Sequence, residues 1–271
     1  MRQLILSGEF GPLGMINTWN YTTFLYRPRR PEELDTSLGG GIIFNQVPHQ
    51  IDTIRLLGGG LVRGVRAVTG IWDRKRPTEG ASLAFLEFED GVGASAVYNA
   101  YDHFDTDEFQ YWITEQGVPK APDQHGATRK ALSVARTPEE EVGMLRTLGY
   151  GGARRVRQPG DPDVHQPHFG VIIVSCERAD LRPSADGIFV YADDEKHEVP
   201  IPPGLGMPGR GDVIDELYDA IVHGRSIVHD GQWGKATLEV CLGILQSSKE
   251  RREIQMAHQV APGDRRAAVA H

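Results

Sequence analysis

The chain has 271 residues, of which 39% are hydrophobic and 24% charged, as in an ordinary globular protein. Its formal net charge of −8 argues against sequence-independent nucleic-acid binding, which depends on a basic face that neutralises phosphates. No run approaches the roughly 18 apolar residues of a membrane helix, and the N-terminus lacks the apolar core of a signal peptide. We therefore expect a cytoplasmic protein without nucleic-acid or membrane partners. Cys176 and Cys241 each lie in an apolar run, which favours buried structural thiols.

The first elements are predicted from glycine positions and apolar spacing. Residues 2–7 are typical of a helix that Gly8 ends, and residues 15–26 are rich in the β-branched and aromatic residues of strands. Between residues 43 and 57, apolar residues recur at spacings of three and four, which indicates a helix. Because proline is tolerated only in the first turn, Pro48 places the helix start near Asn45.

Several strands then follow without helices between them. Strands are predicted at residues 62–72, 82–89, 93–101 and 109–115, and Asp90-Gly91 is a two-residue hairpin signal of the type I′ kind. The chain continues with a capped helix at 137–148 and a Gly- and Pro-rich loop at 149–167. We then predict a strand at 169–177, a hairpin formed by 187–191 and 197–201, and helices at 212–223 and 234–252.

Consecutive hairpin-connected strands followed by helices indicate the α+β class. We predict an open, mostly antiparallel β-sheet with helices packed on one face, forming one domain over residues 1–258, with a flexible tail at 259–271. No alternating strand–helix–strand series occurs, so no Rossmann domain is expected. The Gly-x-Gly-x-x-Gly run at 204–209 follows prolines rather than a strand, and we expect no cofactor-binding residue in this chain.

The clearest candidate for chemistry is the glycine run at 39–41 followed by Asn45 and His49. Residues four apart on a helix lie on one face, and the glycines could leave room for a ligand at that end. A histidine can exchange a proton near neutral pH, as acid–base work on a hydroxyl requires. Spacing alone leaves the alternative open that His49 only packs within the helix start.

These residues also carry a family resemblance. The segments 8–16 and 39–59 are similar to the C-terminal domain of the Gfo/Idh/MocA oxidoreductases, in which glycines, an Asp and a His four residues later open a helix. Segments 89–105, 166–182 and 215–254 extend the resemblance over most of the chain, closest to the phthalate 4,5-cis-dihydrodiol dehydrogenase branch. His49 matches the catalytic histidine of the family. Asn45 stands at the position that is usually Asp, and because an amide is no base, the resemblance implies only an orienting role for it.

The resemblance implies an NAD(P)-dependent oxidoreductase of aromatic degradation. The expected function is oxidation of a hydroxyl of a cyclic diol, such as the cis-dihydrodiol of an aromatic carboxylate, or of a sugar-like substrate. NAD or NADP would be bound mainly by an N-terminal domain absent from this chain, which alone would be inactive. A homo-oligomer, dimer or tetramer, through the sheet face is also implied. The alternative is a non-catalytic domain, from a truncated homologue, that binds a small carboxylate and oligomerises.

Cationic residues are candidates for binding a substrate carboxylate, because arginine can hold a carboxylate through two hydrogen bonds. We select Arg27, Arg30, His165 and His168, with Arg29, Arg154, Arg155 and Arg157 as further candidates. The simpler reading is that each arginine is only a solvated loop residue. The pair His165 and His168 has no third ligand at a suitable spacing, so no metal site is expected.

Overall fold

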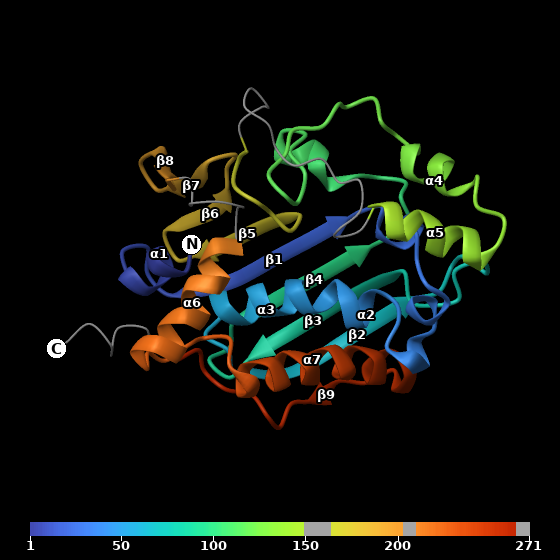
Figure 1. The fold of residues 1–271 in the computed structure, drawn as a ribbon. Coiled ribbons are helices and arrows are strands. Elements are labelled where there is room, and N and C mark those ends of the chain that lie inside the picture. Colours follow the sequence, from blue (N-terminus) through green and yellow to red (C-terminus); the bar gives the residue numbers. More distant parts are fainter. Residues whose placement is uncertain (149–163, 203–209, 264–271) are drawn as a thin grey trace.

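The computed structural model describes residues 1–148, 164–202 and 210–263. Its centre is a single nine-stranded sheet in the order β8-β7-β6-β5-β1-β4-β3-β2-β9. Every neighbouring pair is antiparallel except β1 and β4, which run parallel. The main helices lie on one side of the sheet (Figure 1). The predicted α+β class and the open, mostly antiparallel sheet are therefore confirmed.

The strands span Leu13–Tyr21 (β1), Val62–Gly70 (β2), Ala81–Phe88 (β3), Gly93–Asn99 (β4), Val171–Cys176 (β5), Ala179–Pro183 (β6), Gly187–Ala192 (β7), Lys196–Pro200 (β8) and Ile254–Gln255 (β9). The α-helices span Arg2–Ser7 (α1), Ile42–Asn45 (α2), Val47–Leu57 (α3), Ala127–Leu132 (α4), Pro138–Leu148 (α5), Arg210–His223 (α6) and Gly231–Glu250 (α7). Four 3₁₀ turns complete the described elements: Phe24–Tyr26 (η1), Pro31–Leu34 (η2), Thr36–Leu38 (η3) and Thr106–Gln110 (η4). None of the helices in these ranges is long and apolar enough to cross a membrane.

The two faces of the sheet differ because side chains alternate along each strand. On the covered face, Ala67, Ala84 and Ala96 lie opposite one another on β2, β3 and β4 and are buried. On the other face, Val68 opposes Leu83, and each is 57% exposed. Small side chains on one face thus give room for the helices, while the opposite face is apolar and open.

Helices α3 and α7 cover the alanine face, and Arg55 of α3 joins them. Its side chain is fully buried, with the guanidinium 3.9 Å above the Trp233 ring and hydrogen-bonded to Thr237 of α7 at 2.7 Å. It also donates to Gln259 beyond β9 at 2.9 Å. Burial lowers the pKa of Arg55 to about 10, so the group stays protonated at neutral pH. This one cation therefore fixes the helix that carries His49.

Some boundaries differ from the prediction. The helix predicted from Asn45 to residue 57 is two helices, and the first begins three residues earlier, at Ile42. Pro48 has no N–H to bond to the carbonyl of Phe44, so the helix breaks at Gln46. The hairpin at Asp90-Gly91 is confirmed, but only Gly91 has a positive φ, 86°. The turn is therefore not type I′; it ends in a left-handed glycine instead.

The strand predicted at 109–115 is wrong. Residues Thr106–Gln110 form η4, and Tyr111 and Trp112 then have left-handed φ values of 59° and 56°. A strand needs extended backbone throughout, so this segment pairs only through a single bridge, Ile113 to Pro119. The predicted strand 15–26 likewise ends at Tyr21, before η1. Residues 264–271 of the predicted tail lie outside the described residues.

Candidate functional site

His49 lies in the first turn of α3, on the outer side of the helix layer. The residue is exposed, and neither ring nitrogen has a hydrogen-bond partner among the described residues. Its ring instead contacts the Phe169 ring, with centroids 5.6 Å apart. An aromatic ring on one side and solvent on the other leave both imidazole nitrogens available to a ligand.

Asn45 lies one helical turn before His49, at the end of α2, and is also exposed. Its side-chain oxygen accepts a hydrogen bond from Gln46 at 2.8 Å, while its amide nitrogen has no partner in the described part of the chain. Asn45 could present its amide as a hydrogen-bond donor beside the imidazole.

The glycine run plays a different role from the one predicted. Gly39 and Gly41 have φ values of 82° and 80°, which favour glycine. A Cβ on Gly40 would lie 2.6 Å from the backbone of Glu33, and a Cβ on Gly41 would collide with Thr78. The space beside two of the glycines is therefore filled by the protein itself, and no room for a ligand is left there.

Beneath His49, a buried tyrosine links the helices to the sheet. The Tyr98 hydroxyl of β4 lies 3.0 Å from the Thr22 hydroxyl and 3.1 Å from the side-chain oxygen of Gln46. The Tyr98 ring stacks on Phe169, the same ring that His49 contacts. Burial raises the pKa of Tyr98 well above its ordinary value, so the phenol stays neutral. Sequence reasoning missed Tyr98 and Phe169, although the alternation of β4 already marked Tyr98 as inward-facing.

Of the predicted cations, Arg27 lines a cavity of about 300 Å³ together with Thr22, Glu115 and Lys120. Arg27 donates to the Thr23 hydroxyl at 3.1 Å and lies 3.6 Å from the Glu115 carboxylate. Arg30 does not line that cavity. Its exposed side chain forms ion pairs with Glu32 and Glu33 at 3.4 and 3.3 Å. The structure therefore separates the two arginines.

The two candidate histidines are held by the protein. His165 pairs through Nδ1 with Asp186 at 3.0 Å. His168 is buried; its Nδ1 accepts from the Gly170 amide at 3.1 Å, and its Nε2 lies 2.7 Å from the Ile113 carbonyl. With both nitrogens engaged, His168 has none left for a ligand in this arrangement. Arg154, Arg155 and Arg157 lie outside the described residues.

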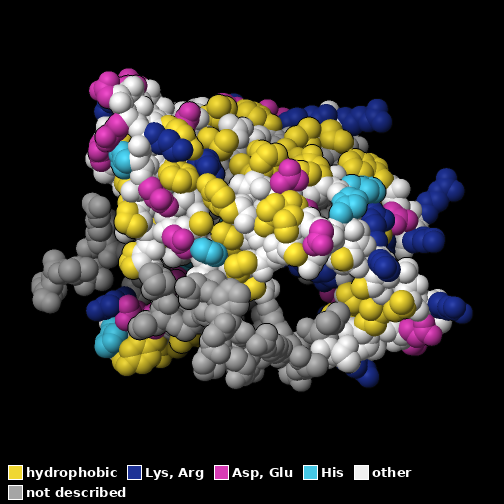
Figure 2. Space-filling model, turned by 90° about the horizontal axis from the view of Figure 1, so that it is seen from above, with side chains coloured by type: hydrophobic (Ala, Val, Ile, Leu, Met, Phe, Trp, Pro, Cys, Tyr) yellow, Lys and Arg dark blue, Asp and Glu magenta, His cyan; other side chains and the backbone are white. Residues whose placement is uncertain are grey.

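A larger cavity of about 940 Å³ lies between η2, the loop after β2, and helices α4 and α5. Figure 2 shows Lys and Arg side chains gathered along the right-hand side of the molecule, the side on which α4 and α5 lie in Figure 1. The cavity is lined by five cations and three carboxylates: Arg29, Lys75, Arg76, Arg129, Arg136, Asp35, Asp73 and Glu141. The cations exceed the carboxylates, so an anion fits this cavity better than a cation.

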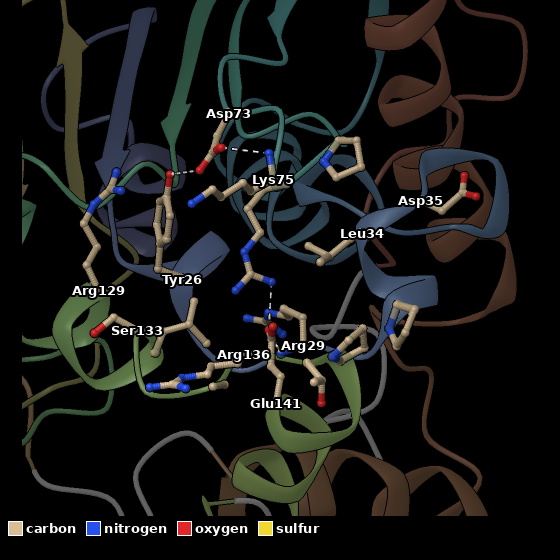
Figure 3. Close-up of a pocket in the computed structure, with 17 residues that line it drawn as sticks. Tyr26, Arg29, Leu34, Asp35, Asp73, Lys75, Arg129, Ser133, Arg136 and Glu141 are labelled. Atoms are coloured by element: carbon tan, nitrogen blue, oxygen red, sulfur yellow. Dashed lines mark hydrogen bonds and ion pairs between the residues drawn. The ribbon is translucent and has the colours of Figure 1, made fainter.

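Internal contacts hold most of these groups, as Figure 3 shows. Arg76 pairs with Glu141 at 2.7 Å, and Arg129 lies 3.6 Å above the Tyr26 ring. The Tyr26 hydroxyl donates to Asp73 at 2.7 Å; burial, together with this carboxylate, raises the pKa of Tyr26 to about 12. Among the described residues, the side chains of Lys75 and Arg136 form no hydrogen bond or ion pair and remain available to an anionic ligand.

The described residues do not offer a cradle for a dinucleotide. A pyrophosphate is ordinarily held by backbone amides at the start of a helix that follows a parallel strand. The parallel neighbours here are β1 and β4, and the element after each of them is a 3₁₀ turn, η1 or η4. Within the same residues, no group of three or more His, Cys, Asp or Glu is arranged to hold a metal ion.

Comparisons with known proteins place this fold in a family. Residues 1–116 match the GFO/IDH/MocA C-terminal domain. Over 253 residues the chain is 41% identical to 1-carboxy-3-chloro-3,4-dihydroxycyclohexa-1,5-diene dehydrogenase of Comamonas testosteroni, covering 92% of this chain and 62% of the relative. It therefore spans less than two thirds of that protein.

Solved structures agree. A protein of Bordetella bronchiseptica RB50 that is assigned as a dehydrogenase is 49% identical, with a TM-score of 0.86 over 94% of this chain and 65% of that one. The WlbA dehydrogenase of Bordetella pertussis, solved with NADH and UDP-GlcNAcA, is 17% identical and shares the fold at a TM-score of 0.53, over 94% of this chain and 58% of that one. By its sequence matches and its sheet, the chain belongs to the GFO/IDH/MocA family and corresponds to its C-terminal domain.

Proposed function

We propose that this chain is the substrate domain of an oxidoreductase that oxidises a hydroxyl of a cyclic diol. The observation that carries the proposal is the exposed imidazole of His49, which has no hydrogen-bond partner in the described part of the chain and lies against Phe169. The Comamonas relative is named for a carboxylated cyclic dihydrodiol, which supports a substrate of that class.

His49 acts as the acid–base group in this proposal. Oxidation of an alcohol removes a proton from oxygen and a hydride from carbon, and an exposed imidazole can accept the proton. Asn45, one turn away, orients the hydroxyl through its amide. Phe169 provides an apolar surface for the ring of the substrate. Arg27 is the proposed contact for a substrate carboxylate, because it lines a cavity beside Thr22, which bonds to Tyr98.

The hydride acceptor is proposed to be NAD or NADP, as structures sharing this fold were solved with NADH or NAD+. Since the described residues lack a pyrophosphate cradle, the nucleotide would be bound by a domain outside them. That domain would occupy part of the length by which the relatives exceed this chain.

The test joins this chain to the part of the Comamonas dehydrogenase that lies outside the match. We expect nicotinamide-dependent oxidation of a carboxylated cis-dihydrodiol, followed by absorbance. His49→Ala should lower turnover by about two orders of magnitude, the scale of general acid–base groups. The exposed His258 serves as a matched control, and its replacement by Ala should leave turnover unchanged. Undiminished turnover of the His49→Ala enzyme would remove His49 from the mechanism.

The open face of the sheet is proposed to join two copies of the chain. Val68, Leu83 and Phe85 are each more than half exposed there, and exposed apolar patches of this kind mark interaction surfaces. Phe85→Glu should therefore convert a dimer or tetramer to a smaller species in light scattering. An unchanged mass would contradict this interface.

The large cavity favours a second candidate function, the binding of a small carboxylate without catalysis. Among the described residues, the side chains of Lys75 and Arg136 line it without a hydrogen-bond or ion-pair partner. Titration of phthalate into the 271-residue chain should then show saturable binding that is lost in a Lys75→Ala/Arg136→Ala double variant. Failure of the unaltered chain to bind phthalate would reject this candidate.

A further inference from the structure

Helix α6 exposes its apolar face. Six large apolar side chains on it are 51–74% exposed: Val213, Ile214, Leu217, Tyr218, Ile221 and Val222. Their spacing of three and four residues places them on one side of the helix. Soluble proteins ordinarily turn such a stripe toward a core, so the stripe on α6 lacks a covering surface in the described part of the chain.

The opposite side of α6 is acidic and is bonded to the loop that follows the helix. The Glu216 carboxylate accepts from the Val228 amide at 2.7 Å and pairs with His229 at 3.0 Å. Asp219 pairs with Arg225 at 2.7 Å. Burial would raise the pKa of Glu216, but the bonds from His229 and Val228 lower it, so the carboxylate stays charged. A membrane-bound helix carries Lys and Arg on its polar side, so this acidic side favours a protein partner.

Side-chain contacts connect α6 to the face of α3 that bears His49. His229, which binds Glu216, also lies 3.4 Å from Asp52 of α3. Arg2, next to the first residue of the chain, donates to the Leu56 carbonyl of the same helix. His49, Asp52 and Leu56 follow at spacings of three and four, so they share the outer face of α3. The start of the chain therefore lies against α3, the helix to which α6 is linked through His229.

We propose that the apolar face of α6 is the docking surface for the N-terminal domain with which this C-terminal domain is joined in its family. The inference rests on the proposed function, in which that domain brings the nucleotide to His49. The family match is to a C-terminal domain, and the chain spans 62–65% of the relatives, so a further domain exists in those proteins to fill the surface.

A second copy of the chain is the competing occupant. The open sheet face already supplies an apolar surface for a second copy, through Val68, Leu83 and Phe85. Helix α6 is linked to α3 through His229, on the side of the sheet that the helices cover (Figure 1). The two surfaces are thus separate, and a different partner is assigned to each.

Hydrogen exchange of α6 tests the docking. This chain, fused to the part of the Comamonas dehydrogenase outside the match, is compared with the 271-residue chain alone. Each is measured with and without Leu217→Glu/Ile221→Glu. Amides of α6 should exchange on the order of tenfold more slowly in the fusion than in the chain alone, and the double variant should abolish the difference. The control pair Val68→Glu/Leu83→Glu lies on the other side of the sheet and should leave the protection intact.

Two results would overturn the docking. One is equal exchange of the α6 amides in the fusion and in the chain alone. The other is protection of the α6 amides in the chain alone that rises with protein concentration. If the fusion does not fold, the solved Bordetella bronchiseptica protein decides. Its segment aligned with α6 should be covered by the part of that chain outside the alignment, and an exposed segment there overturns the proposal. A fusion that protects α6 but oxidises no diol rejects the proposed function alone.

Discussion

Replacing Arg55 by Met tests whether this buried cation holds α3 in place. The guanidinium donates to Gln259, Thr237 and three backbone carbonyls and is not exposed. Methionine keeps much of the side-chain volume but leaves these acceptors without donors. Each buried acceptor that loses its donor costs about 1–3 kcal/mol. Removing the charge from a buried site offsets part of this loss. The net decrease in unfolding free energy should be about 3–5 kcal/mol.

Urea unfolding followed by circular dichroism measures this decrease, and the melting temperature should fall by roughly 6–20 °C. Arg63→Met is the matched control, because the Arg63 side chain is 53% exposed in its pair with Glu87. An exposed pair is worth less than about 1 kcal/mol, so this control should hardly change stability. If Arg55→Met were as stable as the control, this would refute the proposal that Arg55 joins α3, α7 and the segment after β9.

Three further outcomes concern single side chains. Tyr98→Phe removes the hydroxyl between Thr22 and Gln46 and should cost about 1–2 kcal/mol in urea unfolding; unchanged stability would contradict the hydrogen bonds. Burial raises the pKa of Cys241 to about 12, so a disulfide reagent should label it only after unfolding, and labelling of the folded chain would show the site to be open. For Glu239, burial would raise the pKa, but bonds from the Ala257 amide and Gln259 lower it. The charged Glu239 carboxylate therefore stabilises the fold above its ordinary pKa, and this stabilisation is lost in acid. The difference in unfolding free energy between the unaltered chain and Glu239→Gln should shrink below pH 4.5, and a constant difference would refute this.

Local patterns in the sequence predicted the elements that depend on nearby residues. The strand predicted at residues 82–89 places Leu83 and Phe85 on one face, as β3 shows, because successive strand residues point to opposite sides. The apolar spacing before residue 57 predicted a helix, but Pro48 predicted a start near Asn45, whereas α2 begins at Ile42 and α3 at Val47. The glycine run at 39–41 was recognised as special, but the role of Gly41 was not, because it depends on Thr78, far along the chain.

Contacts between distant segments were beyond local patterns. The parallel pairing of β1 with β4 joins residues separated by β2 and β3, and no hairpin signal marks such a pair. Arg27 and Arg29 lie two residues apart just after η1 but line different cavities; Arg27 donates to the Thr23 hydroxyl, whereas Arg29 donates to the Phe24 carbonyl. The expected role of His168 in binding substrate depended on free ring nitrogens, and these are engaged by Gly170 and Ile113.

The sequence by itself determined that a helix occupies residues 212–223 and that Asn45 and His49 lie four residues apart at a helix start. Only the tertiary structure decided that the first helix turns its apolar side to solvent and that the imidazole lies against Phe169. The physical reason is that periodicity identifies the two sides of a helix, whereas which side is buried depends on the surfaces that the rest of the chain provides.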